Sequence, residues 1–117
     1  MNVIQYVLLA VVALIHLYIV ILEMLLWTKP KGIKTFGLKS KAFAEETKVM
    51  AANQGLYNGF LAGGLIWSML SEKIDVALFF LICVFIAGAY GSFSTKKPRI
   101  FVVQSIPALL GLASLIL

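Results

Sequence analysis

Apolar residues fall in four long runs, separated by one long and two short segments that hold most of the charged side chains. The runs span residues 3–27, 49–70, 76–93 and 100–117. A helix needs about 20 apolar residues to cross the roughly 30 Å hydrocarbon core of a bilayer, which is close to the length of each run. The pattern therefore predicts an all-α fold, an integral membrane four-helix bundle formed by a single domain over residues 1–117.

The composition supports a membrane protein over a soluble one. Hydrophobic residues make up 62% of the chain, and the mean hydropathy is +1.00, outside the range of soluble domains. The first run has no basic residue before it and no small-residue cleavage pattern after it, so we expect a permanent helix and not a secretory signal.

The charged residues predict how the helices are oriented. Six lysines lie between the first two runs, and "TKKPR" joins the last two, whereas "SEKID" between the second and third runs is mainly acidic. Lysine and arginine stay on the cytoplasmic side of membrane proteins. We therefore expect both basic loops in the cytoplasm, both termini outside, and a location in the bacterial inner membrane.

The same distribution bears on partners. The net charge of +5 sits in loops that would face an anionic leaflet, so the lysines are expected to contact membrane lipid, and no nucleic-acid partner is predicted. Small residues at four-residue spacing on the second and third helices predict that these two faces pack against each other, within one subunit or across an interface. The two predicted ridges are Gly55, Gly59 and Gly63 on the second helix, and Cys83, Ala87 and Gly91 on the third.

Two ionisable residues interrupt the first apolar run. His16 and Glu23 are seven residues apart, which places them on one face of a helix, almost two turns from each other. A charged carboxylate at the centre of a bilayer costs about 2.5–3.5 kcal/mol. Glu23 is therefore expected to be neutral, to be paired, or to reach water through a cavity.

Uncharged polar residues from the other helices are predicted to meet this pair in the cytoplasmic half of the membrane. With a rise of about 1.5 Å per residue, Asn53 and Gln54 fall at the depth of Glu23, and Asn58 falls at the depth of His16. A ligand-binding site is one interpretation, and structural hydrogen bonding between helices is the alternative. The candidate ligand-binding residues are Asn53, Gln54, Tyr57, Asn58, Tyr90 and Gln104.

If the protein is an enzyme, His16 and Glu23 are the candidate catalytic residues, since an imidazole and a carboxyl group can exchange protons. No nucleophile motif, phosphate-binding loop or cofactor fingerprint occurs in the sequence. One histidine makes a poor metal site. The sequence therefore predicts no metal and no cofactor.

Pro107 lies inside the fourth apolar run and is expected to kink the fourth helix.

Three segments carry a resemblance that extends over essentially the whole chain. They read "AANQGLYNGFLAGGLIW", "AGAYG" and "FVVQSIPALLGL". Together with His16 and Glu23, these segments resemble a family of small bacterial four-helix membrane proteins of unknown function. The resemblance implies a fold and supplies no activity.

The stretch "KVMAANQGLYNGFLA" also resembles the start of the second helix in the membrane-associated proteins of eicosanoid and glutathione metabolism. The match rests on Lys48, Val49, Ala52, Asn53 and Gln54. It implies a four-helix homo-oligomer, a trimer in that family, with ligand sites between subunits. Where glutathione-using members carry an arginine, an asparagine and an acidic residue, this chain has Ala51, Gly55 and Asn58, so the resemblance does not extend to glutathione transfer.

The function expected from these observations is binding of a lipophilic small molecule in a polar pocket near the cytoplasmic face. Proton-transfer chemistry by His16 and Glu23 is left open. One alternative is a small proton-coupled transporter subunit with Glu23 as the protonatable group. Another is an accessory structural membrane protein.

Overall fold

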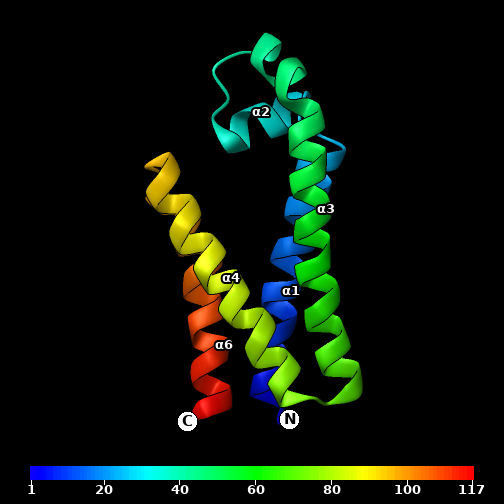
Figure 1. Ribbon diagram of the computed structural model, residues 1–117, viewed down its shortest axis with the longest axis vertical. Helices are drawn as coiled ribbons and strands as arrows, with labels where there is room; N and C mark the ends of the chain where they lie inside the picture. Colours follow the sequence, from blue (N-terminus) through cyan, green and yellow to red (C-terminus); the bar gives the residue numbers. More distant parts are fainter. The chain divides into compact units, whose positions relative to one another are not determined.

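The computed structural model describes all residues, 1–117, and contains helices and turns only. The all-α prediction is thus confirmed. The chain divides into two compact units, one made of Met1–Ile15 with Leu61–Leu117 and the other of His16–Phe60. Two helices, α1 (Val3–Met24) and α3 (Lys41–Ser71), contribute to both units (Figure 1).

The other elements follow the predicted runs with two additions. The short helix α2 and the π-helical segment η1 were not predicted. Helix α3 begins eight residues before the apolar run at Val49, because the segment "KAFAEETK" is helical too. The remaining elements are α2 (Pro30–Phe36), α4 (Ile74–Thr95), α5 (Pro98–Ile100), η1 (Phe101–Ser105) and α6 (Ile106–Ile116).

Three helical segments are long and apolar enough to cross a membrane. They are Val3–Met24, Ile74–Thr95 and Pro98–Ile116. α3 is not among them, since Asn53, Gln54 and Asn58 interrupt its apolar sequence. By length and composition, the chain has the features of a membrane protein with three such segments.

The first unit has a core of small and branched side chains from four helices. Leu9, Val12 and Ala13 of α1 pack with Leu65 of α3, and the remaining members come from α4 and α6: Ala77, Leu81, Val84 and Ala108. α4 and α6 lie side by side, and both chain termini lie at the end of this unit that also holds the α3–α4 turn (Figure 1).

The start of α1 is fixed by reciprocal hydrogen bonds. The backbone N–H of Gln5 donates to Asn2 Oδ1, and the backbone N–H of Asn2 donates to Gln5 Oε1, both over 2.8 Å. This is a capping box, which satisfies N–H groups that a helix start leaves unpaired. Gln5 Nε2 also donates to the Ser114 carbonyl over 2.8 Å, so the cap ties α1 to the end of α6.

The turn between α3 and α4 is attached to the start of α1 through Glu72. The Tyr6 hydroxyl donates to Glu72 Oε1 over 2.8 Å, and the N-terminal ammonium of Met1 lies 3.4 Å from the same oxygen. The hydrogen bond from Tyr6 and, next, the bond and positive charge of the N-terminus lower the pKa of Glu72. This carboxylate therefore ties the α3–α4 turn to the start of α1.

Helix α4 approaches η1 closely because residue 88 has no side chain. A Cβ at Gly88 would collide with Ser105 Oγ and lie 2.9 Å from Gln104 Cβ. Ser105 is fully buried, and its hydroxyl donates to the Phe85 carbonyl over 2.9 Å. Small residues allow the same close approach between helices in membrane proteins in general.

The irregularity expected at Pro107 is found in the residues just before it. In η1, the N–H of Ile106 bonds to the carbonyl of Phe101, five residues earlier. Regular α-helix resumes at Ile106, so Pro107 lies in the first turn of α6, where its missing N–H costs no intrahelical bond. The π-helical turn thus accommodates the proline.

The second unit contains the end of α1, the helix α2 and the first part of α3. The Trp27 and Phe36 rings lie 4.9 Å apart. A Cβ at Gly32 would collide with the Leu26 carbonyl, and Gly37 ends α2 with a φ of 61°, a conformation that glycine adopts without strain. These contacts fold α2 back against the end of α1.

The predicted meeting of two small-residue ridges is wrong within this chain. Gly55 and Gly59 face α1, since a Cβ at Gly55 would lie 2.6 Å from Met24 Cγ and one at Gly59 would lie 3.7 Å from Val20 Cγ2. A Cβ at Gly63 meets nothing within 4 Å. Spacing alone identified faces that permit close packing, but it could not identify the partner of each face.

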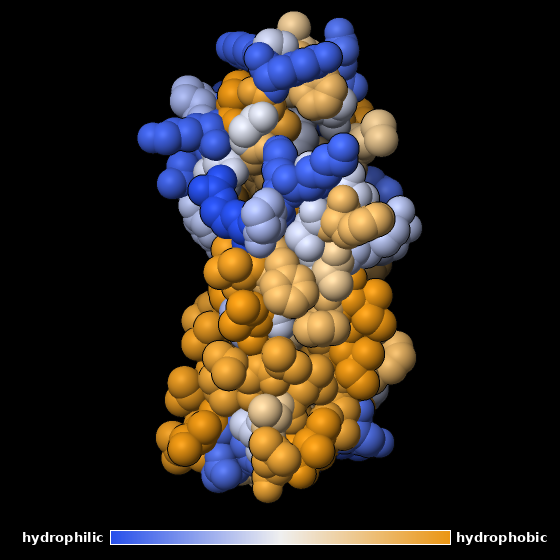
Figure 2. Space-filling view, turned by 90° about the vertical axis from the view of Figure 1, so that its left-hand side faces the viewer, coloured by the Kyte–Doolittle hydropathy of each residue, from blue (hydrophilic) through white to orange (hydrophobic).

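Large apolar side chains are exposed along the helices. On the face of the first unit seen in Figure 2, they form a broad hydrophobic surface. In an apolar 18-residue stretch of each of the three segments, only 33%, 22% and 17% of the residues are buried. A surface of this kind is what a helix presents to lipid or to another subunit.

Candidate functional site

The polar centre of the second unit is a hydrogen bond between α1 and α3. The side-chain amide of Asn58 donates from Nδ2 to Glu23 Oε1 over 2.6 Å. Both side chains are buried, with exposed fractions of 7% for Glu23 and 8% for Asn58. The predicted pairing of Glu23 with an amide of the second apolar run is therefore present, with Asn58 as the donor.

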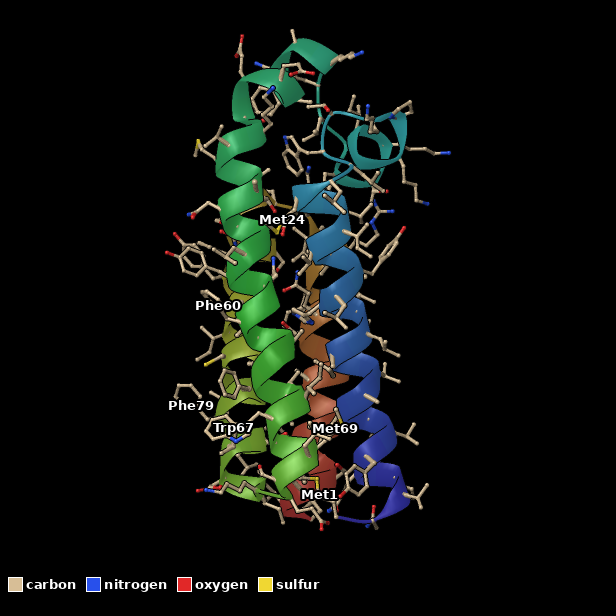
Figure 3. The ribbon with its side chains drawn as sticks, turned by 90° about the vertical axis from the view of Figure 1, so that its right-hand side faces the viewer. Met1, Met24, Phe60, Trp67, Met69 and Phe79 are labelled. Carbon is tan, nitrogen blue, oxygen red and sulfur yellow. The ribbon has the colours of Figure 1, made fainter.

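The direction of the side chains explains why Glu23 bonds to Asn58, although the depth estimate aligned it with Asn53 and Gln54. Side chains tilt toward the N-terminus of their own helix. In the second unit α1 and α3 run side by side in opposite directions (Figures 1 and 3). Glu23 and Asn58 therefore tilt toward each other, which closes the difference in height between them.

Gly55 lets the two helices come close beside this bond. Its missing side chain leaves room for Glu23 and Met24, since a Cβ there would lie 3.1 Å from Glu23 Cβ. A larger residue at position 55 would push α3 away from α1 at the level of the carboxyl group.

A pocket of about 350 Å³ opens beside Glu23. Its walls come from the end of α1, from the segment that precedes α3, and from the first half of α3. The lining is mostly aromatic and aliphatic with a few polar groups, the usual character of a small-molecule site. The lining residues are Glu23, Trp27, Leu38, Phe43, Thr47, Met50, Ala51 and Gln54.

One wall of the pocket is held by a chain of hydrogen bonds. The indole N–H of Trp27 donates to Thr47 Oγ1 over 2.9 Å, and the Thr47 hydroxyl donates to the Phe43 carbonyl over 2.7 Å. These bonds fix the Trp27 ring against α3. The pocket therefore has a wall whose position is set before any ligand arrives.

A lysine lies next to the pocket. Lys39 Nζ is 4.9 Å from the centre of the Phe43 ring, a distance at which an ammonium group interacts favourably with an aromatic face. Lys48 and Glu45, by contrast, form an exposed ion pair over 3.2 Å on α3. Neither of these two residues lines the pocket.

Of the other predicted site residues, one lines the pocket and two belong to the first unit. Gln54 lines the pocket, whereas Asn53 and Tyr57 are exposed on α3. His16 is fully buried. Tyr90 and Gln104 belong to the first unit, and Tyr90 is 71% exposed.

Sequence reasoning missed most of the pocket walls. Trp27 ends the first apolar run, a position typical of a tryptophan that anchors a helix at the membrane surface. The lysines around Leu38 and Phe43 predict contact with lipid headgroups. Two features of the sequence could have indicated these walls. They are the aromatic residues among the lysines of the first loop, and Thr47 on the face of α3 that also holds Ala51. That signal is weak until α2 is known to fold back against α1.

The arrangement favours binding through hydrogen bonds and apolar contact. Glu23 supplies carboxyl oxygens, Gln54 supplies an amide that both donates and accepts, and the remaining walls offer apolar surface. Among the lining residues, Glu23 is the one side chain with an ionisable carboxyl group. Proton transfer by this carboxyl group is therefore the chemistry that the site offers most directly.

Comparison with known proteins finds a bacterial relative of similar length. It is 28% identical to the uncharacterized protein YpaA of Lactococcus lactis subsp. lactis (strain IL1403), over 97% of this chain and 98% of that protein. No solved structure matches the chain. Residues 10–116 match the family described as protein of unknown function (DUF1304), and the chain belongs to that family.

Proposed function

We propose that this protein binds a lipophilic small molecule in the pocket beside Glu23. The apolar part of the ligand lies against Trp27, Phe43 and Met50, and its polar group hydrogen-bonds to Glu23 and Gln54. The ligand therefore carries at least one hydrogen-bond donor, such as a hydroxyl or amide group, because a carboxyl oxygen needs one.

The observation that carries the proposal is that the buried carboxyl group of Glu23 belongs to a mostly apolar pocket of about 350 Å³. A buried carboxyl group is costly in an apolar setting unless hydrogen bonds satisfy it. Asn58 supplies one bond to Glu23 Oε1. A ligand donor in the pocket would supply another, so binding and the burial of this group support each other.

The proposal includes a place in the membrane. We assign four membrane crossings, which are the three apolar segments and α3. Both termini then lie outside, and the basic loops lie in the cytoplasm. Both termini lie at the same end of the first unit (Figure 1), which supports an even number of crossings. The positive charge of the two basic loops supports their cytoplasmic location in the cell membrane.

Two further features belong to the same proposal. The exposed apolar and polar side chains along α3, among them Asn53 and Tyr57, support a homo-oligomer, with a trimer as the form suggested by the eicosanoid and glutathione resemblance. Proton transfer by His16 and Glu23 remains a part of the proposal that binding alone does not require.

The test is mass spectrometry of lipophilic molecules that copurify with the detergent-solubilised protein. We expect a stoichiometric species in the unmodified protein that is absent from Glu23→Gln. The matched control is Glu45→Gln, which removes the same charge from an exposed residue that pairs with Lys48 and should keep the ligand. If Glu23→Gln retains the same species at the same stoichiometry, the proposal is wrong.

A proton-coupled transporter subunit is the second candidate, because a buried carboxyl group in an apolar helix is also what a proton carrier needs. The same variant separates the two functions. In proteoliposomes, a carrier would lose proton flux on Glu23→Gln, whereas a binding protein would show no flux in either form. Bound ligand without proton flux supports the first candidate.

A further inference from the structure

A second pocket lies in the first unit and shares no lining residue with the pocket beside Glu23. Its volume is about 340 Å³, and it is lined by Trp67, Asp75, Val76, Phe79 and Phe80. Three of its five lining residues are aromatic and one is a carboxylate. This combination differs from the pocket beside Glu23, where the polar groups are mainly hydrogen-bonding and partly buried.

The aromatic walls come from two helices. Trp67 of α3 and Phe79 of α4 lie close to each other on the outer side of the ribbon in Figure 3. They are 53% and 61% exposed. The Phe79 and Phe80 rings are 5.3 Å apart and meet edge to face at 86°. Ring faces therefore remain accessible to a ligand.

Gly64 makes room for the third ring. A Cβ at this position would collide with the Phe80 ring. The missing side chain lets Phe80 lie directly against α3 and so closes the inner wall of the pocket. The sequence feature that builds this wall is thus a glycine that belongs to neither predicted small-residue ridge.

The carboxylate gives the pocket a negative charge. Asp75 lies in the first turn of α4, where Oδ1 accepts a hydrogen bond from the Val76 N–H over 2.9 Å. The neighbouring Lys73 forms no ion pair with it, since the salt bridges of the protein involve other residues. Asp75 is exposed, so its charge is available to a ligand.

We propose that this second pocket binds an organic cation, an amphiphile with an alkylammonium headgroup. An ammonium group is attracted to the faces of tryptophan and phenylalanine rings, and most strongly to tryptophan. Asp75 supplies the opposite charge at the edge of the pocket. Phosphate and carboxylate headgroups are disfavoured, because aromatic faces and a carboxylate both repel an anion. The alkyl chains of the ligand lie along the exposed apolar surface of α3 and α4.

The test compares choline with its uncharged isostere 3,3-dimethylbutan-1-ol on the protein in neutral maltoside micelles. The readout is tryptophan fluorescence. We expect a saturable change in fluorescence with choline. The isostere should need about a tenfold higher concentration to reach half-saturation. The change should be lost in Trp67→Phe, which keeps Trp27 as a tryptophan outside the pocket.

Charge is tested by Asp75→Asn, which should weaken choline binding about tenfold. Glu72→Gln is the matched control, since it removes one negative charge from a nearby residue that does not line the pocket, and its binding should be unchanged. Equal half-saturation by choline and the isostere, or equal weakening by the two substitutions, would overturn the proposal. Because the isostere comparison needs no variant, the proposal stays testable if Asp75→Asn fails to fold.

Experiments in lipid nanodiscs distinguish a lipid headgroup from a free cation as the ligand of this pocket. If a lipid headgroup fills the pocket, choline should change the fluorescence in phosphatidylglycerol nanodiscs and not in phosphatidylcholine nanodiscs. If a free cation is the ligand, choline should act in both. The absence of a response in both lipids would overturn the proposal.

Discussion

Asn58 and Glu23 are 35 residues apart on two antiparallel helices, α3 and α1. The side-chain nitrogen of Asn58 nevertheless lies 2.6 Å from a carboxyl oxygen of Glu23. Both groups are buried. This bond is what makes an acid tolerable within the apolar run of α1. It also places the acid where a pocket opens between the end of α1 and α3.

Replacing Asn58 should destabilise the protein through Glu23. Asn58→Leu leaves the buried carboxyl group without this donor, and an unsatisfied buried polar group costs about 1–3 kcal/mol. The measurement is unfolding in mixed micelles. In a protein that already carries Glu23→Leu, Asn58→Leu should reduce the free energy of unfolding by less. The coupling energy between the two positions in this double-mutant cycle should exceed the roughly 0.6 kcal/mol average for interhelical hydrogen bonds in membranes. A coupling energy of zero would mean that the bond does not contribute to stability.

Gly55 and Gly63 should respond in opposite ways to alanine. Gly63→Ala places a methyl group in open space and should stabilise α3 by up to about 1 kcal/mol through helix propensity. Gly55→Ala crowds Met24 and Glu23, and overpacking of this kind costs about 1–3 kcal/mol. Thermal unfolding of the two variants checks the difference, and equal melting temperatures would contradict the packing described here.

Gly88 should be sensitive to alanine because of Ser105. The added methyl group collides with Ser105 Oγ, so Gly88→Ala is expected to cost about 1–3 kcal/mol. The double variant Gly88→Ala with Ser105→Ala removes the colliding oxygen and should recover part of the loss, although Gln104 still crowds the site. Recovery is measured against Ser105→Ala alone, and no recovery would show that the oxygen is not the obstacle.

Stability in acid should depend on Glu72. Hydrogen bonds from Tyr6 and from the N-terminus, together with the charge of the N-terminus, hold the pKa of this carboxyl group below its usual range. A group with a lowered folded-state pKa stabilises the protein fully above its unfolded pKa, about 4.3. That stabilisation is lost as the pH falls through the lower folded-state value.

We therefore expect Glu72→Gln to reduce the melting temperature near neutral pH and to flatten its decline in acid. Tyr6→Phe should act in the same direction with a smaller effect, since the N-terminal amine still contacts Glu72. Melting temperatures between pH 3 and pH 7 measure both effects. A decline in acid that is as steep in Glu72→Gln as in the unmodified protein would assign it to another group.

The sequence by itself determined the all-α class, the approximate positions of the long helices and the membrane character of the chain. These properties depend on the length and apolar content of each run, which are local and additive. It also identified Glu23 as a group that needs a partner, because the cost of burying a carboxyl group in an apolar helix is independent of the rest of the fold.

Tertiary structure decided which residues meet. Asn58 bonds to Glu23 because the antiparallel helices tilt their side chains toward each other, and Gly55 faces α1 because of how α3 is rotated. The walls of the pocket depend on α2, a seven-residue helix that brings Leu38 and Phe43 next to Trp27. Such contacts depend on the rotation of each helix and the path of each loop, which hydrophobic periodicity does not specify.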